Sequence, residues 1–150
     1  MPDPGSLVER ALSVECGTAP ITRDFLSAAT KAVLVAVASD ARESALRRGR
    51  AVYLLGMWRN DESVSVIERV VDELDEAGRM AAASALGRVG TPAATAALER
   101  LIADPSPDVR RVSINGLGAT RTAERIAILR RIAKNDPSEL NRVRAAELLE

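Results

Sequence analysis

The strongest constraint on the fold of this chain is an internal repeat with a period of 31 residues. Shifting the sequence by that period aligns chemically matching residues in six columns. The first three columns are Arg48, Arg79 and Arg110; Leu55, Leu86 and Leu117; and Gly56, Gly87 and Gly118. The other three are Ile67, Leu98 and Leu129; Arg69, Arg100 and Arg131; and Val70, Leu101 and Ile132. Such a repeat is typical of arrays in which each unit stacks on its neighbours.

Each repeat divides into two helices, as its turn residues indicate. Gly90 ends one helix, Thr91 caps the next, and Pro92 takes the first helical position, where its missing N–H costs nothing. Later in the chain, Asp136 and Glu139 predict a capping box. Helices joined by such short turns lie antiparallel.

The apolar periodicity predicts helices throughout the chain and no strand. We expect them at residues 7–16, 23–38, 41–58, 62–74, 77–89, 92–103, 108–119, 123–134 and 138–149. Residues 1–40 fit the repeat frame poorly and are interpreted as N-terminal capping helices of a single domain, 1–150. Residues 41–150 hold the repeats, the last of which is incomplete.

The composition favours an all-α fold and excludes several classes of enzyme. Hydrophobic residues make up 47% of the chain but aromatic residues only 2%, which favours helices packed through small side chains. The absence of histidine removes Ser-His-Asp and Cys-His catalysis and His-ligated metals. The lone Cys16 can form neither a disulfide within the chain nor a CxxC site. We therefore expect a non-enzyme with no catalytic residues, no metal and no cofactor.

The repeat resembles the short HEAT-like repeats, of roughly 30 residues, first described in phycobilin lyases. The resemblance covers about residues 41–150 and rests on Asp108-Val109-Arg110 leading to Leu117-Gly118, on Arg79 leading to Ala85-Leu86-Gly87, and on Thr91-Pro92. It implies a right-handed α-solenoid, a superhelix of antiparallel helix pairs. It says little about function, because one repeat type serves many tasks.

One arginine column is a candidate partner-binding surface. Arg69, Arg100 and Arg131 fall on the second helices, which in solenoids of this kind line the concave face. Guanidinium groups spaced about 10 Å apart suit an acidic protein segment or phosphates. The alternative is a structural ladder in which these arginines pair with Glu68 and Glu99.

Arg130 and Lys134 extend this candidate surface. The main prediction is therefore a non-catalytic protein-interaction scaffold or adaptor, whose partner is another protein with an acidic segment bound on the concave face.

The second arginine column lies at the start of the first helices, where a positive charge opposes the helix dipole. The resemblance implies that each of these arginines pairs with an acidic residue or with loop carbonyls of an adjacent unit. The arginines are Arg48, Arg79 and Arg110, and the acidic residues in suitable loops are Asp75, Asp104 and Asp108.

Charge is unevenly distributed although the net charge is zero. Residues 1–75 hold 9 basic and 12 acidic side chains, and residues 76–150 hold 12 and 9, so the halves carry −3 and +3. Residues 110–144 hold nine basic side chains against three acidic ones. This basic end permits weak nucleic-acid binding as an alternative function. The lack of interleaved aromatic residues argues against stacking on single strands.

The three aromatic side chains allow one further function. Phe25, Tyr53 and Trp58 could line an apolar ligand pocket between the first helices, or they could be ordinary core. An alternative function that the resemblance implies is a bilin lyase-like chaperone, which would bind a linear tetrapyrrole through arginines and Tyr53 or Trp58.

The two ends of the chain lead to the remaining expectations. The longest apolar run, 32–38, is too short to span a membrane, and the N-terminus has no basic segment before an apolar one, so we expect a cytoplasmic protein without a membrane partner. At the other end, the helix at 138–149 has no covering helix. We expect this apolar edge to be covered by a two-fold homodimer, by a bound partner or by further residues of a longer chain. Its apolar residues are Leu140, Val143, Leu148 and Leu149.

Overall fold

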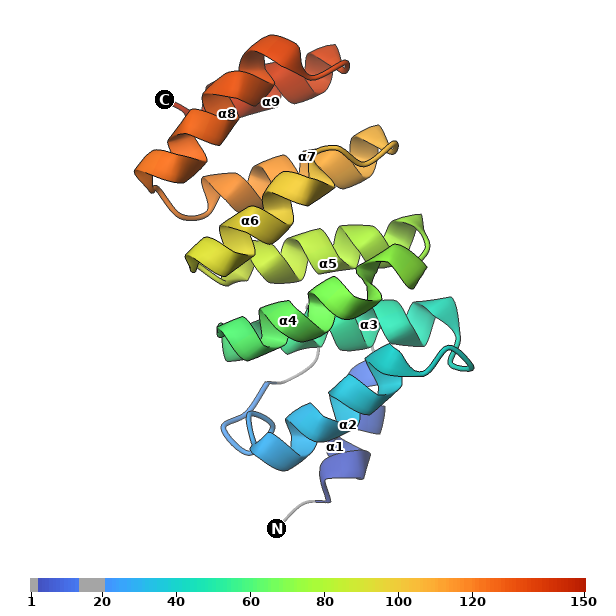
Figure 1. Cartoon of the computed structure of the whole chain (residues 1–150). Helices are drawn as coiled ribbons and strands as arrows, with labels where there is room; N and C mark the ends of the chain where they lie inside the picture. Colours follow the sequence, from blue (N-terminus) through green and yellow to red (C-terminus); the bar gives the residue numbers. More distant parts are fainter. Residues whose placement is uncertain (1–2, 14–20) are drawn as a thin grey trace.

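The computed structural model describes residues 3–13 and 21–150, where all regular structure is helical. The α-helices are α1 (Pro4–Ser13), α2 (Ala28–Ser39), α3 (Ala45–Leu55), α4 (Asp61–Val70), α5 (Glu76–Arg88), α6 (Pro92–Leu101), α7 (Pro107–Gly118), α8 (Ala123–Asn135) and α9 (Glu139–Leu148). Two 3₁₀ turns, η1 (Gly56–Trp58) and η2 (Val71–Glu73), follow α3 and α4. In Figure 1 the first helices, α1, α3, α5, α7 and α9, form a row behind the second helices, α2, α4, α6 and α8. The predicted α-solenoid of antiparallel helix pairs is confirmed.

Most helices begin at the polar residue that the sequence offers as a cap. Thr91 accepts a hydrogen bond from the Ala94 N–H, and Pro92 takes the first helical position. The capping box predicted at Asp136 and Glu139 is wrong, because Ser138 caps α9 instead. Asp136 accepts a hydrogen bond from the Ser138 N–H at 2.8 Å, which leaves its carboxylate in the loop.

The predicted helix bounds need correction in the N-terminal third. The helix expected at 23–38 begins at Ala28, because residues 22–26 form turns in which the Phe25 N–H bonds to the Thr22 carbonyl. The helix expected at 41–58 begins only after Ser44, its N-cap, and ends in η1. The helix expected at 7–16 begins earlier, at Pro4. Its last three residues, including Cys16, lie outside the described residues.

A continuous apolar core runs between the two rows of helices. Its buried residues extend from Val8 in α1 to Ala145 in α9. The repeated leucine column fills equivalent positions in this core, with Leu55, Leu86 and Leu117 at most 1% exposed. The column that marks the repeat in the sequence therefore also marks the layer shared by adjacent units.

Glycine lets neighbouring first helices approach closely. A Cβ atom added to Gly87 of α5 would lie 2.7 Å from the Cα of Gly116 in α7, a distance that real Cβ atoms do not adopt. The backbones of α5 and α7 therefore pack directly against each other. Hollows remain between successive second helices, and these hollows position the surface described next.

Candidate interaction surface

Charged pairs connect successive second helices along their exposed side. Arg100 of α6 pairs with Glu68 of α4, and Arg131 of α8 pairs with Glu99 of α6 at 2.6 Å. The predicted Arg–Glu ladder is therefore present. Both arginine side chains are more than half exposed, and exposed pairs contribute about 0–1 kcal/mol each.

The first arginine of the same column has a different environment. Arg69 is exposed, and no carboxylate within the described residues pairs with it. It lines a hollow between α2 and α4 together with Val35, Glu62 and Ser65. On the α2 side the ion pair is instead made by Lys31, whose Nζ lies 3.1 Å from Glu62.

The α8 end of this surface is basic and has an apolar floor. Arg130 and Lys134 are exposed and lack a carboxylate partner in the part of the chain that the structure describes. Between α6 and α8 a hollow is lined by Ile102 and Ile132, with Arg131 at its edge. Arg131 is the one basic residue among those that line this hollow, and Arg130 and Lys134 are exposed elsewhere on α8.

The α4 end has the opposite charge. Arg69 is the one basic residue in α4 and η2, whereas five residues there are acidic: Asp61, Glu62, Glu68, Asp72 and Glu73. The hollow between α4 and α6 is correspondingly polar, with Asp72, Arg79 and Asp104 among its lining residues. The face of the second helices is thus dipolar, running from acidic at α4 to basic at α8.

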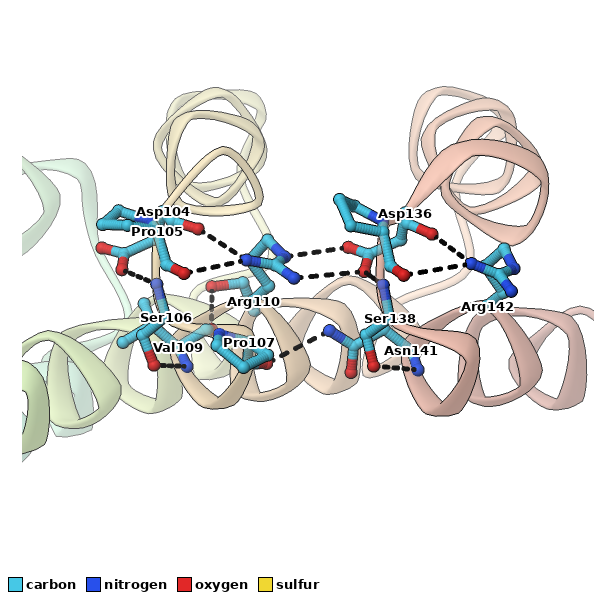
Figure 2. A network of polar contacts seen from close by, with 12 residues as sticks. Asp104, Pro105, Ser106, Pro107, Val109, Arg110, Asp136, Ser138, Asn141 and Arg142 are labelled. Atoms are coloured by element: carbon cyan, nitrogen blue, oxygen red, sulfur yellow. Dashed lines mark hydrogen bonds and ion pairs between the residues drawn. The ribbon is translucent and has the colours of Figure 1, made fainter.

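The arginines at the start of the first helices hold adjacent units together. Arg79 of α5 donates from Nε to Asp104 at 2.7 Å and from Nη1 to the Leu74 carbonyl at 3.1 Å. Arg110 of α7 bonds in the same way to Asp136 of the next loop, as Figure 2 shows. We call each such arginine and the carboxylate of the following unit a rung.

Arg48 forms a rung with Glu73 at 2.7 Å and also donates to the Ala38 carbonyl. The structural role expected for this column is confirmed, but of the three acidic residues proposed only Asp104 takes part. Asp75 instead caps α5, and Asp108 pairs with Arg111 one turn along α7.

The rung at Asp104 also sets the ionisation of its carboxyl group. Burial alone would raise the pKa of Asp104, but hydrogen bonds from Arg79 and from the Ser106 N–H outweigh it. Together with the charges of Arg79 and Arg110, they hold the pKa of Asp104 below its ordinary value.

Comparison with known families agrees with this architecture. A model of HEAT repeats matches residues 30–111 and, in a second register, residues 75–150. Together the matches span residues 30–150. The chain belongs to the HEAT repeat family. No curated protein matches the chain. HEAT repeats generally serve as protein-interaction scaffolds.

In this HEAT repeat protein the three aromatic residues have different surroundings. Phe25 is buried, with its ring centroid 5.9 Å from that of Trp58. Tyr53 instead lies under the guanidinium of Arg88, 4.0 Å from the ring centroid. These are contacts of ordinary core and its margin, and a tetrapyrrole site at these residues stays a prediction.

The sequence did not predict that Arg125 is a buried cation in this HEAT repeat protein. Arg125 near the start of α8 is 0% exposed and donates to Thr95 Oγ1 at 2.7 Å and to the carbonyls of Gly116 and Val89, each at 3.0 Å. Burial lowers the pKa of Arg125, but a guanidinium in a protein stays protonated. The one sequence signal was an arginine within the first turn after the cap Thr122, where acidic residues are normally favoured.

The predicted basic end is therefore smaller than its sequence count suggests. Arg125 is inside the protein, and Arg110 and Arg144 are paired with Asp136 and Glu147. Of the basic residues in this segment, Arg130, Arg131 and Lys134 of α8 are exposed, as are Arg111 and Arg121 outside that helix. This arrangement gives the nucleic-acid alternative less support than the charge count did.

Two further observations concern residues 3–13 and 21–150 only. They contain no cluster of three or more His, Cys, Asp or Glu side chains placed to hold a metal ion. None of their helices is long and apolar enough to cross a membrane.

Proposed function

We propose that this HEAT repeat protein is a non-catalytic scaffold that binds an acidic segment of another protein on the face of its second helices. The observation that carries the proposal is the α8 end of that face. Arg131 there lines a hollow together with Ile102 and Ile132, and Arg130 and Lys134 are exposed on the same helix. The cations would bind carboxylates, and the hollow would take one aliphatic side chain.

The ladder supports the same proposal along the rest of the face. Arg100 and Arg131 are already held in position by Glu68 and Glu99, so little side-chain entropy is lost when a partner's carboxylate joins them. Arg69 extends the row to α4. A segment lying across α4, α6 and α8 would meet these three arginines one repeat apart.

The change from acidic residues on α4 to basic residues on α8 predicts the orientation in which a partner segment would bind. Its acidic end would lie on α8, where the exposed cations are, and any basic residues would lie toward the acidic residues of α4. Because these contacts are exposed, binding should weaken as salt is raised.

The test is affinity capture from a nuclease-treated extract of the source cells with matched charge variants. The variant Arg130→Glu/Lys134→Glu alters the proposed surface. The control Arg23→Glu/Arg42→Glu makes the same charge change at exposed positions away from α8. We expect a protein captured by wild type and control to be lost by the α8 variant.

Equal capture by all three proteins would refute the proposed surface. A protein that is captured from an untreated extract but not from the nuclease-treated one would favour the nucleic-acid alternative. A peptide from the captured protein, labelled for fluorescence anisotropy, then measures how much each of Arg69, Arg100 and Arg131 contributes when changed to Glu.

A further inference from the structure

A polar pocket lies on the first helices, apart from the face of the second helices. It has a volume of about 460 Å³ and is formed by α5, α7 and the loops that follow η1 and α7. In Figure 1, α5 and α7 belong to the row behind the second helices. Of the described residues that line the pocket, none comes from α2, α4, α6 or α8. The pocket is therefore separate from the surface proposed for an acidic segment.

Two cations line this pocket, and no acidic residue of the described chain does. Arg59 lies in the loop after η1, and Arg88 lies in the last turn of α5. The acidic residues nearest to Arg59 in the sequence, Asp61 and Glu62, begin α4 and do not line the pocket. The C-terminal ends of α5 and α7 add a partial negative charge of about half an elementary charge each. Two guanidinium groups outweigh it, so the pocket attracts anions.

The neutral polar side chains of the pocket add hydrogen-bond donors. Ser84 and Thr120 contribute hydroxyl groups. The Oδ1 of Asn115 accepts a hydrogen bond from Nε of Arg144 at 2.7 Å, which leaves the Nδ2 amide as a donor. Arg144 itself is paired with Glu147 and adds no unbalanced charge. The polar lining therefore consists of groups that can donate hydrogen bonds to an anion.

The repeat does not account for the cation at position 88. One period before and one period after Arg88 stand Met57 and Ala119. Nη1 of Arg88 lies 3.1 Å from Sδ of Met57, and its guanidinium lies 4.0 Å from the ring centroid of Tyr53. These contacts hold the guanidinium in position at the pocket. A guanidinium has five N–H donors in a planar fork, which suits the oxygens of a bound oxyanion.

Arg59 has an unusual backbone conformation for its residue type. Its φ is 49°, in the left-handed region, and it is the one non-glycine residue with a positive φ in the described part of the chain. Arg121, two periods later, donates to the carbonyls of Leu148 and Leu149. The side chain of Arg59, by contrast, makes no hydrogen bond or ion pair within the described residues. The structure thus gives Arg59 no polar contact that would favour it over glycine at this strained position.

We propose that this pocket binds the phosphate group of a small organic phosphate monoester, held between the guanidinium groups of Arg59 and Arg88. At pH 7 such a phosphate carries a charge of about −1.5 to −2 and has three acceptor oxygens. These properties match two cations and several neutral donors better than a carboxylate does. Val112 and Ala119 also line the pocket, and they would contact the organic group.

Titration of isotope-labelled protein with phenyl phosphate at low salt, followed by amide NMR, tests the proposal. We expect saturable shifts of the backbone amides of Gly87 and Thr120 and of the side-chain amide of Asn115. Inorganic phosphate should shift the same signals with lower affinity, because it lacks the contacts of the phenyl group. Acetate should bind at least about tenfold more weakly than phenyl phosphate.

Two variants and a matched control assign the binding to this pocket. Arg59→Gly should weaken phenyl phosphate binding at least about tenfold. Glycine adopts a φ of 49° without strain, so this variant should fold like the wild type. Asn115→Asp keeps an oxygen for Arg144 but replaces the amide donor by a carboxylate, and it should weaken binding similarly. Arg23→Gly makes the same change as Arg59→Gly in an exposed turn and should bind like the wild type.

Four outcomes would overturn the proposal. The first is a wild type without saturable shifts. The second is a set of shifts confined to α8, which would assign the phosphate to the exposed cations there. The third is an affinity that both variants retain. The fourth is acetate, or a short duplex DNA, that shifts the same amides and binds as tightly as phenyl phosphate, because the pocket would then not select a phosphate monoester.

Discussion

Replacing Arg125 by methionine should destabilise the protein by about 2–4 kcal/mol, although it removes a buried charge. Methionine has a similar length but no donor. The variant regains the several kcal/mol that desolvation of the guanidinium costs. It loses three charge-assisted hydrogen bonds worth about 1.5–3 kcal/mol each, to Thr95, Gly116 and Val89. The sum of the lost bonds exceeds the regained solvation.

Loss of the guanidinium affects the hydrogen bonding of the three acceptors differently. The Gly116 carbonyl still accepts from the Ala119 N–H, and the Thr95 hydroxyl still donates to the Thr91 carbonyl. The carbonyl of the buried Val89 has no second donor among the described residues. An orphaned buried carbonyl costs about 1–3 kcal/mol, which forms the larger part of the expected loss.

Urea unfolding followed by far-UV circular dichroism measures the effect. The midpoint should fall while the slope stays unchanged, because the folded structure buries the same surface. Arg130→Met, an exposed arginine on the same helix, is the control and should lie within about 0.5 kcal/mol of the wild type. A methionine variant as stable as the wild type, or more stable, would refute the reasoning about the acceptors.

Three further perturbations test the packing and the rungs. Leu117→Ala should cost about 2–5 kcal/mol in urea unfolding through lost burial and a cavity, whereas Arg100→Ala should stay within about 0.5 kcal/mol; similar losses would contradict the assigned helix faces. Gly87→Ala should lower the free energy of unfolding by about 1–3 kcal/mol because the added Cβ meets the Gly116 backbone. Gly49→Ala should be tolerated, because its Cβ would lie 3.4 Å from the nearest atom. Thermal melting that ranks the two variants in reverse would contradict the close approach of α5 and α7. The stability that Asp104 contributes should be fully present above its ordinary pKa of 3.8 and be lost as pH falls through its lower folded-state pKa. The free energy of unfolding of Asp104→Asn should therefore change less with pH in this acid range than that of the wild type. Parallel pH curves for the two proteins would show that this rung adds nothing to stability.

Local chemistry made the helices predictable from the sequence. A cap such as Ser106 or Thr91 satisfies an N–H three residues away, and the leucine column repeats at the spacing of a stacked unit. Both signals depend on neighbours in the chain, so the helix pairs and the burial of Leu86 and Leu117 follow from them. The later start of α2 shows the limit, because the helical pattern from residue 23 gave no sign of the turns that end at its cap, Ser27.

Contacts between units were decided by the tertiary structure. The sequence indicated that Arg48, Arg79 and Arg110 pair with acidic loop residues, but Glu73 and Asp136 form rungs where Asp75 and Asp108 do not. Acidic residues a few positions apart in one loop are chemically alike, so the sequence does not show which of them an arginine contacts. Only the stacking distance between units selects the carboxylate that an arginine reaches.

The burial of Arg125 was decided in the same way. Its sequence position placed it in a basic, surface-like segment, yet the stacking of α5 and α7 brings the carbonyls of Val89 and Gly116 to one point beside α8. Three acceptors from different helices make burial of the guanidinium favourable there, and no local pattern records their convergence. The sequence by itself determined the repeat, the helices and the leucine layer, whereas the partner of each charged side chain depended on the distances between units.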